Sequence, residues 1–294
     1  MTIDLPEFRP VDIGDKPLIE GFLRAHPSEA CEINFTNIYI WRAFERTRHA
    51  VINGNLCILC QPPNEPPYFL PPIGMTDLRG TIEVCFTIAP RLSRVPEGFV
   101  KAHCGGLLSE PDRDNFDYVY GTGDLILLKG KKYDGKRNHI SRLERNFSWR
   151  YLRLTPDRMD DCRRLFDEWF NGKAESGEAV GAEKEAILEA LSGFESLGLT
   201  GGAIEIGGRI AAFSIGEKLT GDTAVVHIEI AGRGTPGLSQ LINREFARNE
   251  WVSFSFVNRE QDVGLPGLRR AKLSYHPHHL VRKYTVTPPA RNTP

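Results

Sequence analysis

The sequence lacks the features that would place it among membrane, secreted or strongly charged proteins. Its 37 Lys and Arg residues nearly balance 38 Asp and Glu residues, leaving a formal net charge of -1. This balance argues against wholesale adsorption to nucleic acid or to an anionic membrane. No apolar run approaches the ~20 residues that cross a bilayer, and no N-terminal segment has the basic start and apolar core of a signal peptide. We therefore expect a soluble, cytoplasmic protein.

Cysteine is also sparse, and its spacing does not favour a metal site. The six cysteines lie mostly in apolar or helical patterns, which is typical of reduced, buried thiols. Cys57 and Cys60 form a Cys-x-x-Cys pair, but zinc needs a second pair, and only His103-Cys104 is offered, without the required spacing. Pro277 interrupts the run His276–His279, so its histidines cannot pair at helical spacing. The sequence predicts no metal site.

The length and composition indicate two ordinary globular domains. A chain of 294 residues with 40% hydrophobic and 26% charged residues is long for one compact core and natural for two. We place an N-terminal domain at 1–145, ending in a basic linking helix, and a C-terminal domain at 146–294. The segment 129–153 holds nine Lys or Arg residues against two acidic ones. It is interpreted either as an exposed linking helix or as a cradle for a polyanion such as tRNA.

The first half alternates helices with strands. A cap and a first-turn proline predict a helix over 15–25, and Asn53-Gly54 predicts a hairpin turn. We also expect a short helix or a buried segment at 35–44, and further helices at 78–92 and 136–146. A short strand is expected at 68–70, and a strand, a turn and a second short strand within 116–130.

The second half predicts a meander followed by a crossover. A strand at 149–154 precedes helices that begin at Thr155-Pro156 and at 182. Glycine pairs then turn three antiparallel strands between 201 and 231. A helix with Thr235 as N-cap and Pro236 in its first position leads directly to a strand at 251–257. A strand, helix and strand joined so tightly form a right-handed crossover, so strands 224–230 and 251–257 should be parallel.

Two loops should meet beyond the carboxyl ends of these parallel strands, where ligands tend to bind. The first loop, 231–237, carries three glycines ahead of a helix N-terminus, and backbone N–H groups there can approach phosphate closely. The alternative is a plain glycine-rich turn before a capped helix. The predicted cofactor-binding residues are Arg233, Gly234, Gly237, Leu238 and Ser239. The second loop is "NREQDVGLPGLRRAKLSYHP", residues 258–277.

The fold pattern and the first loop resemble the GNAT acyltransferases. "KGKKYDGKRNHISRL", "NRE…D.G..GLRRAKLSY.P" and "LVRKY" are similar to an uncharacterised bacterial family grouped with the C-terminal domain of phosphatidylglycerol lysyltransferases. The resemblance covers nearly the whole chain. It implies an α+β fold of tandem GNAT-like domains related to the Fem aminoacyltransferases, with mixed, mainly antiparallel sheets flanked by helices.

The resemblance also implies an activity. We expect transfer of an acyl or aminoacyl group from acyl-CoA or aminoacyl-tRNA, used as co-substrate without a tightly bound cofactor, to an amine or hydroxyl of a small-molecule, lipid or peptide acceptor. A noncatalytic protein that binds phosphate or RNA with the same fold is the alternative. The sequence leaves the donor, the acceptor, the oligomeric state and any site of the first half open.

Acyl transfer needs a base and an acid, and two residues are the catalytic candidates. Glu229 is the candidate base, on the same strand face as His227, because residues two apart share a face. The alternative is that Glu229 and His227 have no catalytic role and are polar residues on an exposed or hydrogen-bonded face of the strand. Tyr275 is the candidate acid, since GNAT enzymes often place a tyrosine just after the fifth strand. Its spacing from Leu265 and Leu268 also fits a packed core aromatic.

Further polar residues of the second loop are candidates for substrate binding. The first set shares one basic helix face and suits phosphate or carboxylate, although a solvated face is the usual meaning: Arg269, Lys272 and His276. The second set follows the strand and could orient an amino or aminoacyl group, or form a capped, salt-bridged turn: Asn258, Arg259, Glu260 and Asp262.

Overall fold

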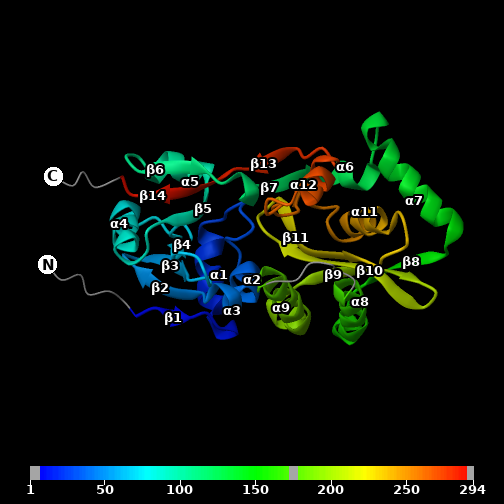
Figure 1. The fold of residues 1–294 in the computed structure, drawn as a ribbon, viewed down its shortest axis with the longest axis horizontal. Helices are drawn as coiled ribbons and strands as arrows, with labels where there is room; N and C mark the ends of the chain where they lie inside the picture. Colours follow the sequence, from blue (N-terminus) through cyan, green and yellow to red (C-terminus); the bar gives the residue numbers. More distant parts are fainter. Residues whose placement is uncertain (1–6, 172–177, 290–294) are drawn as a thin grey trace. The chain divides into compact units, whose positions relative to one another are not determined.

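The computed structural model describes residues 7–171 and 178–289, which divide into two compact units (Figure 1). Unit 1 is built from residues 7–117, 261–266 and 280–289, and unit 2 from the remaining described residues. Both units are therefore assembled from segments distant in sequence. The boundary predicted at 145/146 lies inside unit 2, at the end of helix α7 (Asp134–Asn146).

Unit 1 contains a seven-stranded sheet in which one neighbouring pair is parallel. Its order is β1 (Arg9–Pro10), β2 (Arg48–Ile52), β3 (Asn55–Cys60), β4 (Tyr68–Phe69), β5 (Leu92–Pro96), β14 (Lys283–Thr287) and β6 (Leu108–Pro111). Strands β4 and β5 are parallel and joined through helix α4 (Leu78–Ile88), whereas the other neighbours are antiparallel. The remaining helices are α1 (Lys16–Ala25), α2 (Phe35–Ile40), α3 (Arg42–Glu45) and α5 (Glu97–His103), with 3-10 turns at Ile13–Asp15 and Arg113–Asn115.

The sequence predicted the local turns and the core thiols of this unit. Asn53 and Gly54 turn the β2–β3 hairpin with φ of 50° and 77°, as a tight turn requires. All six cysteines of the chain are buried free thiols. Cys57 and Cys85 pack with Phe69, Leu92 and other apolar side chains in the core beside α4. The Cys-x-x-Cys pair thus consists of strand thiols, because β3 is buried along its whole length.

Unit 2 contains most of a second seven-stranded sheet with the same pattern, in which only residues 117, 280 and 281 are grouped with unit 1. Its order is β13 (His279–Val281), β7 (Asp117–Gly121), β12 (Phe256–Asn258), β11 (Thr223–Ala231), β10 (Arg209–Lys218), β9 (Thr200–Ile206) and β8 (Trp149–Arg153). Strands β8 to β11 form the antiparallel meander, and β11 and β12 are parallel, as predicted.

Helices cover both faces of the second sheet. Figure 1 shows α11 (Leu238–Glu250) on one face and α8 (Met159–Asn171) with α9 (Glu178–Ser192) on the other. Shorter helices are α6 (Thr122–Leu127), α10 (Phe194–Leu197) and α12 (Pro266–Leu273), with 3-10 turns at Lys131–Tyr133 and Pro156–Arg158. Residues 212–216 of β10 are all buried, as expected for a strand packed on both sides.

The two sheets share one strand order, and each is completed by a strand from a distant part of the sequence. In unit 1, β14 from the end of the chain lies between β5 and β6. In unit 2, β7 from the first half of the chain lies between β12 and β13. Both sheets therefore consist of a meander, a parallel pair and two further strands, which is the repeated architecture expected from the resemblance.

Three local predictions were wrong. Residues 122–127 form helix α6 rather than a strand, and Leu125 from this helix is buried. Helix α11 begins at Leu238 with Gly237 as its N-cap, not at Thr235 and Pro236. Trp251 does not extend into a strand, because its ring packs edge-on against Phe246 and Phe254 in a turn, so β12 spans only 256–258.

Within the parts of the chain that the structure describes, no helix combines the length and the apolar character needed to cross a bilayer.

Candidate functional site

The parallel strands of unit 2 separate, and β11 extends beyond the end of β12. Strands β11 and β12 pair at only three positions, the last of which joins Val225 to Asn258. Strand β11 then continues to Ala231, paired with β10 but no longer with β12. Glu229 lies on this part of β11, opposite Ser214 of β10, and Arg259 is the first residue after β12. The two side chains meet where the parallel pair opens.

The carboxylate of Glu229, the predicted base, is held by two other side chains. Nη2 of Arg259 lies 3.0 Å from each carboxylate oxygen, and the side-chain amide of Asn243 on α11 donates to Oε2 at 3.1 Å. Together, Arg259 and Asn243 fix the position of the Glu229 carboxylate.

Arg259 is the central cation of this cluster. Its guanidinium lies 5.6 Å from the ring centroid of Tyr120 and 5.0 Å from that of Tyr275, within cation–π range. Burial lowers the pKa of Arg259, but Glu229, Tyr120 and Tyr275 together outweigh it and raise the pKa above its usual value. Among the described residues, buried Nη1 has no hydrogen-bond partner. This nitrogen can donate to a carbonyl or phosphate oxygen.

Tyr275, the predicted acid, is buried and lies near two cations. Besides Arg259, the ammonium of Lys136 on α7 lies 4.2 Å from the centroid of its ring. Burial raises the pKa of Tyr275 well above its usual value, more than Arg259 lowers it. In the described parts of the chain, its hydroxyl makes no hydrogen bond. The phenol is thus protonated at neutral pH and free to donate.

Lys136 and Tyr120 were not predicted as site residues. Burial and the charge of Arg259 lower the pKa of Lys136, whose ammonium also donates to the hydroxyl of Ser274 at 2.7 Å. The hydroxyl of Tyr120 donates to the carbonyl of Lys272 at 2.9 Å. In the sequence, Lys136 counted only toward the charge of segment 129–153, and Tyr120 had no pattern that distinguished it from a core residue.

The pairing of β11 with β10 shifts register at His227, so the shared face with Glu229 stays a prediction, and His227 is bonded to other partners than Glu229. Its Nδ1 lies 2.8 Å from Oε1 of Glu260, and its Nε2 lies 3.0 Å from Oε1 of Glu217. Burial lowers the pKa of His227, but the two hydrogen-bonded carboxylates outweigh it and raise the pKa to about 9. His227 is therefore an imidazolium at neutral pH, fixed between two carboxylates, and is not a base.

Asn258 and Lys272 shape the turn that carries Arg259. Oδ1 of Asn258 accepts the backbone N–H of Glu260 at 2.7 Å. The ammonium of Lys272 donates to the backbone carbonyls of Arg259 and Glu260, the latter at 3.2 Å. Glu260 itself has a φ of 56°, which such bonds help to hold. These residues position Arg259 in the structure.

The other candidates of the second loop have contacts of their own. Asp262 belongs to unit 1, where its fully buried carboxylate lies 3.3 Å from Nη1 of Arg113 and accepts the N–H of Gly264. Arg269 is half-buried on α12, and the ring of His276 packs edge-on against Tyr133. The residues of the predicted basic face, Arg269, Lys272 and His276, therefore do not share a common set of contacts.

The glycine-rich loop before α11 contains both exposed and buried residues. Arg233, Gly234 and Ser239 are exposed, whereas the side chain of Leu238 is buried and its N–H donates to the carbonyl of Thr235 at 3.3 Å. Gly237 has a φ of 95°, and a Cβ there would lie 2.3 Å from the carbonyl oxygen of His139. Close packing against α7 therefore requires this glycine, and phosphate binding by the loop stays a prediction.

We expect Gly237→Ala to destabilise the protein by about 1–3 kcal/mol, because the added methyl group collides with backbone. Gly234→Ala is the matched control, since Gly234 has a similar φ of 80° but open space around its Cβ position. Urea unfolding of both variants measures the difference. Equal losses of unfolding free energy in the two variants would show that backbone strain, and not contact with α7, accounts for the effect of Gly237→Ala.

Unit 1 contains a buried ion network that the sequence did not predict. The fully buried ammonium of Lys283 contacts the carboxylates of Glu32 and Asp117, the latter at 2.5 Å. Burial lowers the pKa of Lys283, but Asp117 and Glu32 raise it well above its usual value. The thiol of Cys31 donates to Asp117 at 3.2 Å. Lys283 lies in "LVRKY", one of the motifs that carried the resemblance, which was its signal in the sequence.

The same network is the cluster with metal-ligating potential among the described residues. Ligand atoms of Cys31, Glu32 and Asp117 lie within 4.8 Å of one another. The Lys283 ammonium, however, already contacts both carboxylates. It supplies the positive charge that these buried carboxylates need, so the arrangement is explained as an ion network.

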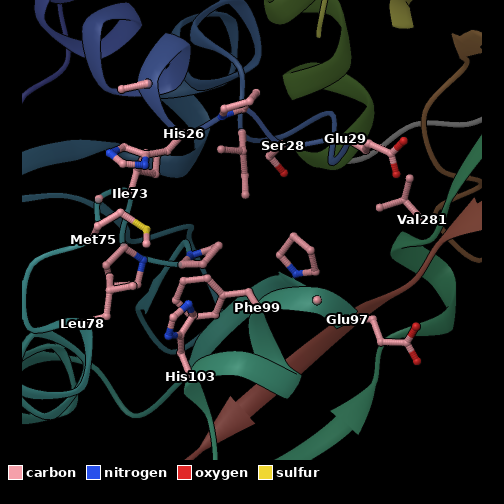
Figure 2. A pocket seen from close by; sticks show the side chains of 18 of the residues that line it. His26, Ser28, Glu29, Ile73, Met75, Leu78, Glu97, Phe99, His103 and Val281 are labelled. Carbon is pink, nitrogen blue, oxygen red and sulfur yellow. The ribbon is translucent and has the colours of Figure 1, made fainter. Parts of the chain in front are cut away.

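Unit 1 also contains a cavity of about 670 Å³ (Figure 2). Its lining includes Pro71–Met75, Pro96–Phe99 and His103, and none of the site residues predicted from the sequence. The candidate site of unit 2 and this cavity are separate features of the two units.

The comparisons with known proteins agree with the two-sheet architecture. A conserved protein of unknown function from Bacteroides thetaiotaomicron is 32% identical, with a TM-score of 0.88 over 96% of this chain and 99% of that one. L-PGS from Bacillus licheniformis is 17% identical, with a TM-score of 0.67 over 97% and 94% of the two chains. FemX is 9% identical, with a TM-score of 0.56 over 95% and 97%. No curated protein matches the chain.

These likenesses and the repeated sheets define an α+β protein of two similar units with mixed sheets flanked by helices, a fold that it shares with FemX. Residues 24–287 match the family model described as "Phosphatidylglycerol lysyltransferase, C-terminal". The chain belongs to this family, as the sequence motifs predicted.

Proposed function

We propose that unit 2 transfers an acyl or aminoacyl group from a phosphate-containing donor, either aminoacyl-tRNA or acyl-CoA, to an amine or hydroxyl. Membership of an aminoacyltransferase family supports this reaction class. The observation that carries the proposal is the buried cluster of Glu229, Arg259 and Tyr275 where β11 and β12 separate. It combines a carboxylate, a cationic donor and a protonated phenol in one place.

Each member of the cluster has a role in this reaction. Unpartnered Nη1 of Arg259 donates to the carbonyl oxygen of the transferred group, which gains negative charge in the transition state. Glu229 accepts the proton of the attacking amine or hydroxyl, and Tyr275 donates a proton to the leaving group. Lys136 and Arg259 stabilise the negative charge that forms on the phenol oxygen after this transfer.

Tyr275→Phe is expected to lower the rate of acyl release from the donor by ~10²–10⁴-fold and to leave donor affinity unchanged, because only the proton donor is removed. Release is measured with aminoacyl-tRNA and with acetyl-CoA, and affinity from the rise in melting temperature that each donor causes. Tyr151→Phe is the matched control, since it removes a phenol hydroxyl of the same unit that is bonded to Glu250 at 3.0 Å. Equal rates for Tyr275→Phe and the unaltered protein would exclude the proposed acid.

A second candidate function is RNA binding without catalysis, and the exposed cations of segment 129–153 favour it. Arg150 and Arg153 pair with Glu205 and Glu250, but a group of basic side chains on and before α7 is exposed: Lys129, Lys131, Lys132, Arg142 and Arg145. If the protein only binds RNA, it releases no acyl group from either donor. Replacing Lys129, Lys131 and Lys132 by Glu then lowers the affinity for tRNA and makes this affinity less dependent on salt.

A further inference from the structure

The cavity of unit 1 lies at the position where a sheet of this topology binds ligands. Strands β4 and β5 are parallel but share only the pair Phe69–Leu92. The cavity is lined by Pro71–Met75, which follows β4, and by Pro96–Phe99, at the end of β5 (Figure 2). Ligands of such sheets bind beyond the carboxyl ends of parallel strands. The topology and the cavity therefore indicate the same place independently.

The walls of this cavity are fixed by the backbone. Leu56 and Ile73 exchange two backbone hydrogen bonds of 2.9 Å, which attach the segment after β4 to β3. Gly74 packs so closely that a Cβ would lie 2.1 Å from Oδ1 of Asn55. On the other wall, the N–H of Glu97 donates to the carbonyl of Arg282 at 3.0 Å. The site is thus preformed, as ligand cavities usually are.

The wall chemistry suits an alkyl chain. Most lining side chains are aliphatic or proline, including Pro71, Ile73 and Leu78, and Met75 is 72% exposed beside them. Phe99 is the single Phe, Tyr or Trp among the lining residues, and His103 already packs against it at 4.9 Å. Such a wall favours flexible aliphatic groups over the stacking of an aromatic base.

The polar groups of the cavity disfavour an anionic ligand. Figure 2 shows Met75, Leu78 and His103 on one side and the carboxylates of Glu29 and Glu97 on the opposite side. The one arginine of the lining, Arg282, lies 3.8 Å from Glu97. Three further lining residues can donate or accept hydrogen bonds without a fixed charge: His26, Ser28 and His103.

We propose that unit 1 binds a neutral amphiphile, an alkyl chain that ends in a hydroxyl, ester or amide group. The chain lies along the aliphatic wall, and its polar end bonds to the imidazole and hydroxyl groups. The cavity holds the volume of roughly twenty water molecules, enough for a chain of medium length. This site is independent of the transfer reaction proposed for unit 2.

Calorimetric titration of the full chain with decanol and with decanoate tests the ligand class. Decanol is expected to bind saturably, and decanoate about tenfold more weakly, because Arg282, the one Lys or Arg of the lining, already pairs with Glu97, so the carboxylate of decanoate loses hydration without gaining a cation. From hexanol to decanol the affinity should rise by roughly fourfold per methylene, the gain expected for burial of each group. Tighter binding of decanoate, or no dependence on chain length, would overturn the proposal.

Two glycine variants test the location. Gly98 is exposed on α5 in the lining, and its Cβ position meets no atom within 4 Å, so Gly98→Trp fills the cavity mouth without disturbing the core. Gly21 on α1 is equally exposed and open but lies outside the lining, which makes Gly21→Trp the matched control. Gly98→Trp should weaken decanol binding by about tenfold or more, since a bound chain and the indole compete for one space. Equal affinities of both variants would place the binding elsewhere and overturn the inference.

Discussion

Replacing Lys283 by methionine is expected to lower the free energy of unfolding by about 3–5 kcal/mol. The substitution removes the cation that contacts Glu32 and Asp117, and it leaves two buried carboxylates whose charge is no longer compensated. Lys283 is fully buried, so water cannot replace it without rearrangement of the core. Urea unfolding monitored by circular dichroism measures the loss.

An exposed lysine is the control for this experiment. Lys101 pairs with Glu97 at 3.3 Å, but its side chain is 71% exposed, so Lys101→Met should cost less than about 1 kcal/mol. Adding Asp117→Asn to Lys283→Met should recover part of the loss, because one buried charge then disappears. A small effect of Lys283→Met, together with no recovery in the double variant, would contradict a stabilising role of the ion network.

The stability of the protein is expected to fall as the pH rises from 6.5 toward 9, because of His227. Its pKa is raised from 6.5 to about 9 in the folded protein, which corresponds to about 3 kcal/mol of stabilisation. A raised pKa means that the folded state binds the proton more tightly than the unfolded state. The contribution is therefore complete below pH 6.5 and is lost as the pH passes through 9, with roughly half of it lost by pH 8.

His227→Gln shows how much of this pH dependence belongs to His227. The variant should be less stable at pH 6.5, since Glu217 and Glu260 lose the positive charge between them. Its stability should then vary less between pH 6.5 and 8 than that of the unaltered protein. Comparison stops at pH 8 because the thiols of the unfolded chain ionise near ~8.5 and add their own loss. Parallel pH profiles of the two proteins would contradict the assignment.

Local sequence signals predicted much of unit 2 because its strands and turns carry their own chemistry. Gly207 and Gly208 have positive φ in the turn between β9 and β10, where glycine pairs were recognised. Strands β11 and β12 were correctly expected to be parallel, since a helix joins them. The position of Glu229 near Arg259 follows from this pairing. The partners of each charged side chain, such as Arg259 beside Glu229, do not follow from it.

The parts that were not predicted depend on contacts between residues far apart in the sequence. Lys283 contacts Glu32, which lies about 250 positions earlier, and no local pattern connects them. Lys136 reaches Tyr275 by packing of α7 near the end of α12. Strand β14 inserts between β5 and β6, and only the complete sheet shows where it belongs. Residues 122–127 became a helix because burial of Leu125 against its surroundings outweighed their strand-like composition.

The position of strand β14 has a consequence for folding during synthesis. The ribosome synthesises the chain from its N-terminus, so the sheet of unit 1 lacks the strand between β5 and β6 until residues 283–287 have been made. During that delay two strands keep unsatisfied amide and carbonyl groups, which invite pairing with the wrong partner. A nascent chain interrupted before its final strand should consequently need chaperone protection, even with every other element of unit 1 already made.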